Sequence, residues 1–215
     1  MEALLQLLLV PKRWKFLRNL KKKHPMSEGL IASLRARCEE AKRANSQTYL
    51  GIYNAGLFVA LLNRDMTTYN ESIFLARSKW HRQFHARNLA VLLYETAEDL
   101  PQMLGKNYRA CLTDLELGQS WLDSLGEITS QIAQFKSSHN AFLKDVRNYV
   151  GAHREHDSLA QLTMLDSLDS LVVYKLAGDL FAPIRKLIDY NIKLLNYMHN
   201  PAVMLRHACK IADRA

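Results

Sequence analysis

The sequence predicts an all-α fold, an antiparallel bundle of four to five long helices. Apolar residues recur every three or four positions through most of the 215 residues, as they do along one face of an α-helix. Only eight glycines and five prolines are present, so turns are few and the elements between them are long. Apart from short ambiguous runs, no stretch alternates with the period of two that is typical of a strand. An antiparallel bundle is the simplest architecture that buries such faces.

The composition predicts one globular domain in a reducing compartment. Hydrophobic residues make up 48% and charged residues 23% of the chain, which is long enough for one core and too short for two ordinary domains. Cys38, Cys111 and Cys209 are widely separated and form no CxxC pair. Neither a disulfide framework nor a structural zinc site is expected, and the sequence favours a cytoplasmic protein.

Residues 1–26 are expected to form a short apolar helix and a basic segment. The apolar residues 1–10 are too few to span a membrane, which takes about 20. In a secretory signal the positive charges precede the apolar stretch, and here they follow it. Residues 3–27 carry seven lysines and arginines and no acid, so most of the net charge of +8 lies here.

This basic segment has two interpretations. The simpler one is a solvated segment that follows a helix packed on the body of the protein. The other is a surface for RNA or anionic lipid, with Trp14 and Phe16 stacking on bases or anchoring in a membrane interface. In that case Lys21, Lys22 and Lys23 bind substrate phosphates.

Residues 27–215 are expected to form a single helical bundle domain. Ser27 follows Pro25 and predicts the N-cap of a helix whose apolar stripe reaches Val59. Gly51 and Gly56 either weaken the second half of this helix or allow close packing there.

Three further elements are expected before residue 158. One helix covers about residues 68–99 and ends near Pro101. A shorter helical stretch covers about residues 101–125 and can break at Gly118. The next helix is the most regular, with one apolar face stepping by three and four residues. That face contains Ile128, Ile132, Phe135, His139, Phe142, Val146 and Val150.

The last long helix is expected at about residues 158–200. Pro183 should kink or divide it, and Pro201 follows its end, after which a short tail remains.

One short run, residues 147–153, carries the chemistry expected of this chain. Arg147 can hold a phosphate through two parallel hydrogen bonds, and His153 can move a proton near neutral pH. Six residues of an ideal helix turn about 600°, which leaves these side chains roughly 120° and about 9 Å apart. They can meet if the helix loosens at Gly151, or if two copies pair across a two-fold axis.

The run resembles the signature of the HEPN superfamily, small helical domains that include RNA-cleaving toxins and defence nucleases. That signature is an arginine, a polar residue that is commonly asparagine or histidine, several variable residues and a histidine. Arg147-Asn148, four residues and His153 match it. The architecture is similar over about residues 65–200, and a vaguer match starts at Arg87. The resemblance implies a metal-independent endoribonuclease that acts as a dimer, with Arg147 and His153 as its active pair.

Such a site uses the 2′-hydroxyl of RNA as the nucleophile. His153 would act as general acid or base while Arg147 stabilises the phosphoryl oxygens, giving a 2′,3′-cyclic phosphate and a 5′-hydroxyl. Asn148 can orient His153 or a phosphate oxygen, and Tyr149 and Arg154 can contact substrate. No cofactor is expected. The expected partners are RNA, a second copy of the chain and an antitoxin or regulatory protein.

Two other functions stay open. Many HEPN domains are not nucleases, and some are scaffolds that bind a partner protein or a nucleotide. In such a scaffold Arg147 can pair with Asp145 or another acid while His153 lies at a helix end. Burial of the pair in salt bridges favours such a scaffold, whereas an exposed groove favours the enzyme. A peripheral membrane protein would instead need residues 4–9 exposed as an apolar face.

Three polar clusters have a simpler structural interpretation. His153, His156 and Asp157 have metal-ligand spacing, but a polar cluster at a helix end is favoured. The pair His81 and His85 lacks the glutamate of the HExxH motif, so packing or surface roles are favoured. The third cluster is an acidic patch near a helix end, formed by Glu95, Glu98 and Asp99. Glu95 can approach the active pair, although a solvated face is favoured.

Overall fold

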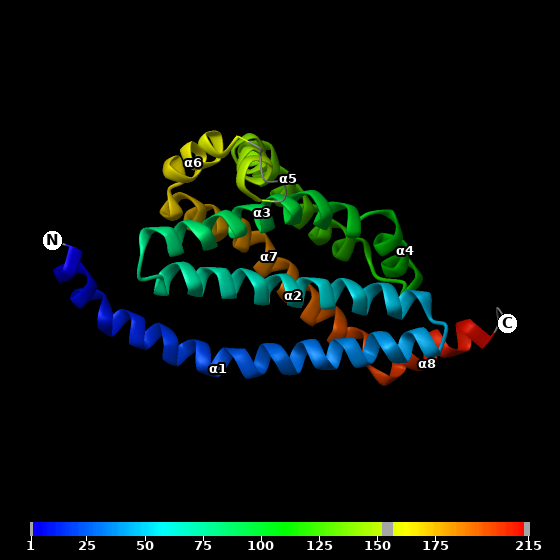
Figure 1. The fold of residues 1–215 in the computed structure, drawn as a ribbon. Helices are drawn as coiled ribbons and strands as arrows, with labels where there is room; N and C mark the ends of the chain where they lie inside the picture. The colour runs from blue at the N-terminus through cyan, green and yellow to red at the C-terminus, as the bar shows by residue number, and fades with distance from the viewer. Residues whose placement is uncertain (1, 152–156, 213–215) are drawn as a thin grey trace.

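The computed structural model confirms an all-α fold (Figure 1). It describes the backbone of residues 2–151 and 157–212, and the side chains of 14–22, 24–149, 157–206 and 209. No strand occurs within these ranges. The elements are α1 (Glu2–Arg43), α2 (Gln47–Leu75), α3 (Lys79–Met103), α4 (Lys106–Asp114), α5 (Gln119–Val146), the π-helical turn η1 (Arg147–Gly151), α6 (Ser158–Ser167), α7 (Ser170–Met198) and α8 (Pro201–Ala212).

Four long helices, α2, α3, α5 and α7, enclose the core. α7 packs against the other three, while α3 also packs against α2 and α5. α1 lies along α2 on the side away from α5, and α6 packs against η1 at the opposite edge of the molecule (Figure 1). The bundle therefore separates the N-terminal helix from the turn that contains Arg147.

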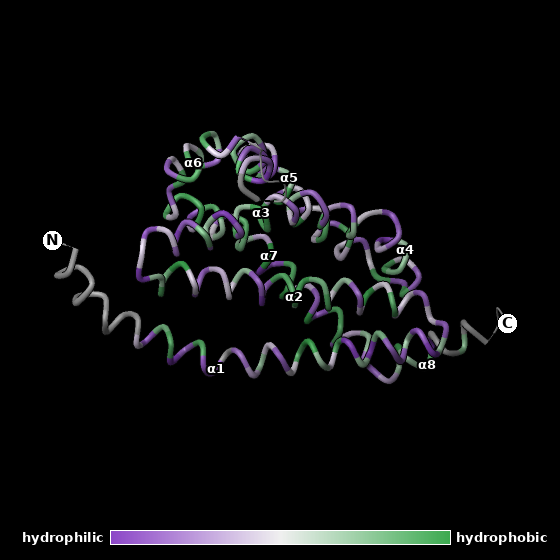
Figure 2. Tube along the Cα trace, in the orientation of Figure 1, coloured by the Kyte–Doolittle hydropathy of each residue, from purple (hydrophilic) through white to green (hydrophobic). Residues whose placement is uncertain are grey.

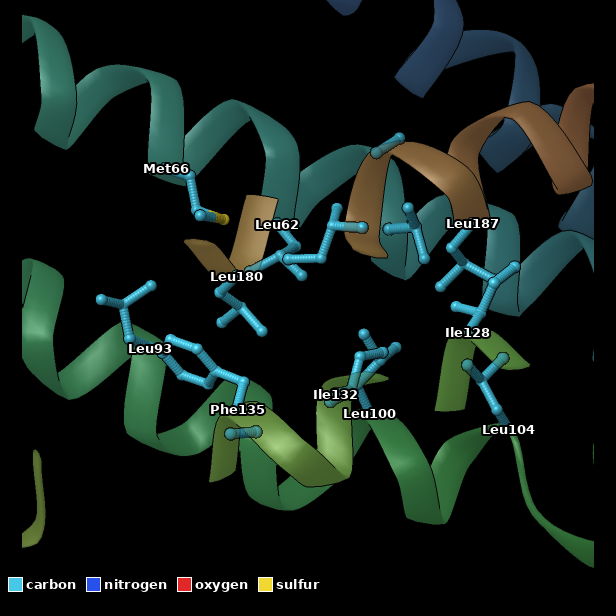
Figure 3. Close-up of a cluster of buried hydrophobic side chains, with 14 of the residues drawn as sticks. Leu62, Met66, Leu93, Leu100, Leu104, Ile128, Ile132, Phe135, Leu180 and Leu187 are labelled. Atoms are coloured by element: carbon cyan, nitrogen blue, oxygen red, sulfur yellow. The ribbon is translucent and has the colours of Figure 1, made fainter. Parts of the chain in front are cut away.

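The core is made mostly of leucine and isoleucine side chains, with Met66 and Phe135 among them, and these point toward one another from the four helices (Figure 3). Leu100, Ile132, Leu180 and Leu187 are all 0% exposed. Because burying one such side chain contributes about 1.5–3 kcal/mol, this cluster supplies much of the stabilisation of the bundle. Regular apolar spacing along α5 and α7 predicts these contacts.

α1 is one continuous helix, so the expected new helix at Ser27 is wrong. The helix runs through Pro25, where the boundary between residues 1–26 and the rest was expected. Proline removes one hydrogen bond of the helix and favours a bend, and Figure 1 shows α1 changing direction in its N-terminal part. Figure 2 shows hydrophilic and hydrophobic residues alternating where α1 lies along α2, as expected of a helix with one buried side.

In the N-terminal half, two expected helices are each interrupted by a turn that contains neither glycine nor proline. The helix expected from Ser27 to beyond Val59 breaks at residues 44–46, where Asn45 has a φ of 52°. Asparagine tolerates this left-handed conformation better than most residues. The helix expected at 68–99 breaks at residues 76–78, and the Ser78 side chain then caps α3 by accepting a hydrogen bond from the His81 N–H.

The C-terminal half follows the expected order with smaller differences. Gly118 does separate two helices, but α3 continues past Pro101 to Met103. Pro183 lies within α7 without dividing it, and the long helix expected at 158–200 instead breaks at residues 168–169. The segment after Asn200, expected only as a short tail, forms the helix α8.

Glycine allows a close approach between α2 and α4. A Cβ atom at Gly51 would lie 2.7 Å from Cys111 Sγ, so the close-packing interpretation of this glycine is confirmed. Cys111, Cys38 and Cys209 are all free thiols. Burial raises the pKa of the Cys38 and Cys111 thiols. Among the described residues, no helix is long and apolar enough to cross a bilayer.

Candidate active site

Arg147 lies where α5 changes from an α-helix into a π-helical turn. This turn, Arg147–Gly151, follows Val146 directly. π-Helical turns have the wider i→i+5 hydrogen bonding and occur frequently at functional sites. A loosened helix before His153 is one of the two arrangements expected from the sequence, and η1 agrees with it.

The Arg147 side chain is held against α3 by two neighbours. Its Nε donates a hydrogen bond to Glu95 Oε1 at 2.5 Å, and its guanidinium carbon lies 5.4 Å from the centre of the Tyr94 ring. The hydrogen bond and the charge of Glu95 raise the pKa of Arg147, so the guanidinium stays protonated. Arg147 keeps 30% of its side-chain surface exposed. Glu95 thus approaches Arg147, as one of its two interpretations expects, while 40% of its own side chain stays exposed.

A second ion pair joins the same two helices. Lys136 Nζ on α5 lies 2.7 Å from Glu98 Oε2 on α3. Together, Glu95–Arg147 and Glu98–Lys136 form what we call the α3–α5 seam. Of the acidic patch expected on this helix, two members are therefore committed to ion pairs, while Asp99 is exposed. Arg147 pairs with Glu95 rather than with its neighbour Asp145.

Asn148 and Tyr149 are exposed on the same turn. Tyr149 faces α6 and lines an open pocket of about 480 Å³ together with Leu159, Thr163 and Met164. Arg147 does not line this pocket. Arg147 and Tyr149 thus face different neighbours, one toward α3 and the other toward α6.

The remaining residues expected near the active pair lie largely outside the described part of the chain. His153, Arg154 and His156 belong to the segment 152–156, which is not described. Asp157 accepts hydrogen bonds from the N–H groups of Leu159 and Ala160 and thereby caps α6. This role is consistent with the helix-end interpretation of Asp157.

The two histidines of α3 pack on each other. The His81 and His85 rings are 4.8 Å apart. Burial, and secondarily the charge of His81, lower the pKa of His85. Within the described residues, no group of three His, Cys, Asp or Glu side chains is placed to hold a metal ion.

The basic N-terminal segment lies away from this site. Lys21 and Lys22 are exposed on α1, on the opposite side of α2 from η1 (Figure 1). Trp14 is 64% exposed, whereas Phe16 turns toward α2 and its ring lies 4.8 Å from that of Phe74. The side chains of Lys23 and of residues 4–9 lie outside the described part, so the apolar face that a membrane interpretation needs is a prediction still.

No protein-family model matches the chain, and neither the curated proteins nor the solved structures give a match. The residues that hold Arg147 in place are the main finding that sequence reasoning missed. Sequence reasoning gives Tyr94 no role, and it allows Glu95 to approach the active pair but favours a solvated face. The available signal was that both lie in the helix of the vaguer match that starts at Arg87.

Proposed function

We propose that this chain is a HEPN-type endoribonuclease that needs no metal ion, with Arg147 and His153 as its active pair. The observation that supports the proposal best is the local geometry at η1. Glu95 and Tyr94 fix the position of the Arg147 guanidinium, yet the side chain stays partly exposed. A positioned cation of this kind favours charge that develops on a phosphate in the transition state.

The ion pair leaves Arg147 able to bind a phosphate. A guanidinium has five N–H donors, and the Glu95 bond uses the one on Nε. The two terminal nitrogens then remain for two parallel bonds to phosphoryl oxygens. In this proposal Glu95 positions Arg147, His153 transfers the proton, and Asn148 and Tyr149 contact the RNA strand beside them.

We further propose that the active form is a homodimer. Large apolar side chains on α6 and the first turn of α7 are exposed: Leu159 at 73%, Leu162 at 47%, Leu171 at 73% and Val172 at 46%. Figure 2 shows hydrophobic residues along α6, next to the end of α5. Exposed apolar residues that gather in one region favour a protein–protein contact. A two-fold contact here would bring the turns of both copies toward one groove.

The second candidate function is a non-catalytic scaffold that binds a nucleotide or a partner protein, such as an antitoxin or regulator. The observation that favours it is the α3–α5 seam itself. Two ion pairs tie α3 to α5 and η1, and such pairs serve structure as well as chemistry. The apolar surface of α6 would then bind the partner instead of a second copy.

One experiment separates the two functions. Purified protein is incubated with mixed RNAs in EDTA, and the product ends are identified. The enzyme is expected to leave 2′,3′-cyclic phosphates and 5′-hydroxyls, and to spare DNA and 2′-O-methyl RNA, because the nucleophile is missing or blocked. His153→Ala should abolish cleavage while the circular dichroism spectrum stays the same. Cleavage that needs a divalent ion, or that survives this substitution, contradicts the proposal; no cleavage by the wild-type dimer favours the scaffold.

A further inference from the structure

A second pocket lies on the other side of the bundle, between α1, α2 and α7. It has a volume of about 670 Å³, within the usual range for small-molecule sites. Each helix contributes one stripe of side chains to its walls. The residues that matter for its chemistry are Phe16, His24, Arg64, Asn70, Tyr174 and Arg185. We call it the α1–α2–α7 pocket.

Three polar atoms of these lining residues are buried without a hydrogen-bond partner among the described residues. They are His24 Nε2, Arg64 Nη1 and Asn70 Oδ1. Glu71 Oε2 lies 3.5 Å from His24 Nε2, close enough for attraction between charges, but the two atoms form no hydrogen bond. A buried polar group left unpaired costs about 1–3 kcal/mol. Three of them in one pocket indicate a place built for a polar ligand.

The charge of the pocket favours an oxyanion. Arg64 binds Glu28 on the surface through Nη2, at 3.2 Å, and keeps Nη1 for the interior. Arg185 on α7 lines the same pocket and is exposed. One acid, the exposed Asp189, also lines the pocket, so the two arginines outnumber it. Two guanidinium groups at one pocket match the geometry of a phosphate, which arginine binds through paired N–H groups.

The other walls favour a flat ring. Phe16, Tyr174 and Phe181 line the pocket from α1 and α7. Aromatic faces stack on nucleobases whatever their sequence, with about 1–3 kcal/mol for each base. The free Asn70 oxygen accepts a hydrogen bond, for which a sugar hydroxyl or a base amino group is a suitable donor.

We propose that the α1–α2–α7 pocket binds a phosphorylated nucleoside, with Arg64 and Arg185 on its phosphate and the aromatic residues on its base. The ligand is a free mononucleotide or a single nucleotide unit of an RNA strand, since both present the same groups. Nothing in this inference requires that the chain cleaves RNA. The site lies on the α1 side of the bundle, away from Arg147.

The test measures binding to the full chain by calorimetry, with AMP, ribose 5-phosphate and a short 2′-O-methyl oligonucleotide that cannot be cleaved through its 2′-hydroxyl. Arg64→Gln removes the buried donor and is expected to weaken AMP binding about tenfold to a hundredfold. Glu28→Gln is the matched control, because it breaks the same surface ion pair and leaves Arg64 in place. It should leave AMP binding unchanged or tighter.

Three more variants keep the proposal testable if Arg64→Gln unfolds. Arg185→Gln changes an exposed residue and should weaken both AMP and ribose 5-phosphate, whereas Arg206→Gln on α8 should weaken neither. Tyr174→Leu should weaken AMP but not ribose 5-phosphate. Tighter binding of AMP than of the oligonucleotide identifies a free nucleotide, and the reverse identifies an RNA strand. The inference is overturned if wild type binds none of the three ligands at millimolar concentration, or if Arg185→Gln binds AMP as wild type does.

Discussion

The α3–α5 seam and the α1–α2–α7 pocket handle their polar side chains in opposite ways. In the seam, Arg147 and Lys136 each have an acidic partner across the helix pair, at 2.5 Å and 2.7 Å. In the pocket, the Arg64 guanidinium is paired only at its surface side, and its inner nitrogen has no partner among the described residues. The charged groups of the seam are paired with each other, whereas three polar atoms at the pocket remain available for a ligand. The comparison shows that the amount of charge alone does not identify a binding site.

The largest effect is expected from breaking the seam at Arg147. Arg147→Ala should reduce RNA cleavage by about 10²–10⁴, because a cation that stabilises the transition state is lost. Lys136→Ala is the matched control, since it removes the other ion pair of the same helices and no proposed catalytic group. The cleavage rates of the two variants, measured at equal folded fraction, show whether Arg147 has a catalytic role beyond its ion pair. Equal losses would mean that the seam acts through structure alone.

The next largest effect concerns the core under the seam. Leu100 is 0% exposed on α3, and Leu100→Ala should lower the free energy of unfolding by about 2–5 kcal/mol. Leu61→Ala, at a position that is 45% exposed on α2, should lower it by much less. Urea denaturation measures both. If the two variants lose the same stability, the packing in Figure 3 does not dominate the fold.

A pair of polar-to-apolar substitutions compares an amide that has a hydrogen-bond partner with one whose oxygen has none. Gln83 Nε2 donates to Leu165 O at 2.6 Å, so Gln83→Leu should lower the free energy of unfolding by about 1 kcal/mol. Asn70→Leu removes an unpaired acceptor from the pocket and should leave stability unchanged or higher in the absence of ligand. Thermal denaturation of both variants is the measurement. A larger loss for Asn70→Leu than for Gln83→Leu would show that Asn70 is already satisfied.

The salt dependence of RNA binding separates the contribution of the α1 lysines to affinity from that of the candidate active site. Replacing both Lys21 and Lys22 with alanine should flatten the slope of log affinity against log salt by about 0.7 per lysine for single-stranded RNA. All RNA sequences should be affected alike, because these side chains would contact phosphates. Filter binding at several salt concentrations provides the slopes. Loss of binding to one RNA sequence only would indicate that α1 reads bases.

The smallest effect is expected for the surface ion pair beside the pocket. Glu28 is 65% exposed, and Glu28→Gln should change the free energy of unfolding by less than about 1 kcal/mol. Denaturation at low and high salt measures it. A loss of several kcal/mol would mean that the pair, rather than the core, joins α1 to α2.

The sequence predicts the helical class and the apolar stripe of α5 well, because both depend on spacing along the chain. It fails at the turns of residues 44–46 and 76–78, where neither glycine nor proline marks the break. There the signals are weak local ones, such as the Ser78 cap and the left-handed Asn45. It also misplaces a boundary at Pro25, since a proline in a long helix bends it without ending it.

The candidate site, too, is only partly predictable from the sequence. The Arg147 motif and the possible loosening of the helix follow from local sequence. The partner of Arg147, Glu95, is 52 residues away, and only tertiary packing favours it over Asp145, which lies nearby on the same helix. The pocket is even harder to predict from the sequence, because its walls come from three separate helices.

The position of α7 has a consequence for the order in which the molecule assembles. α1, α2 and α3 follow one another through short turns and can pair soon after they form. α7 must return across a long stretch of chain, as the bond between Tyr108 and Asn191, 83 residues apart, illustrates. Closing such a loop is slow, since its entropy is lost before the contacts form. The third wall of the pocket is thus completed late, and a bound nucleotide would report that the chain has finished folding.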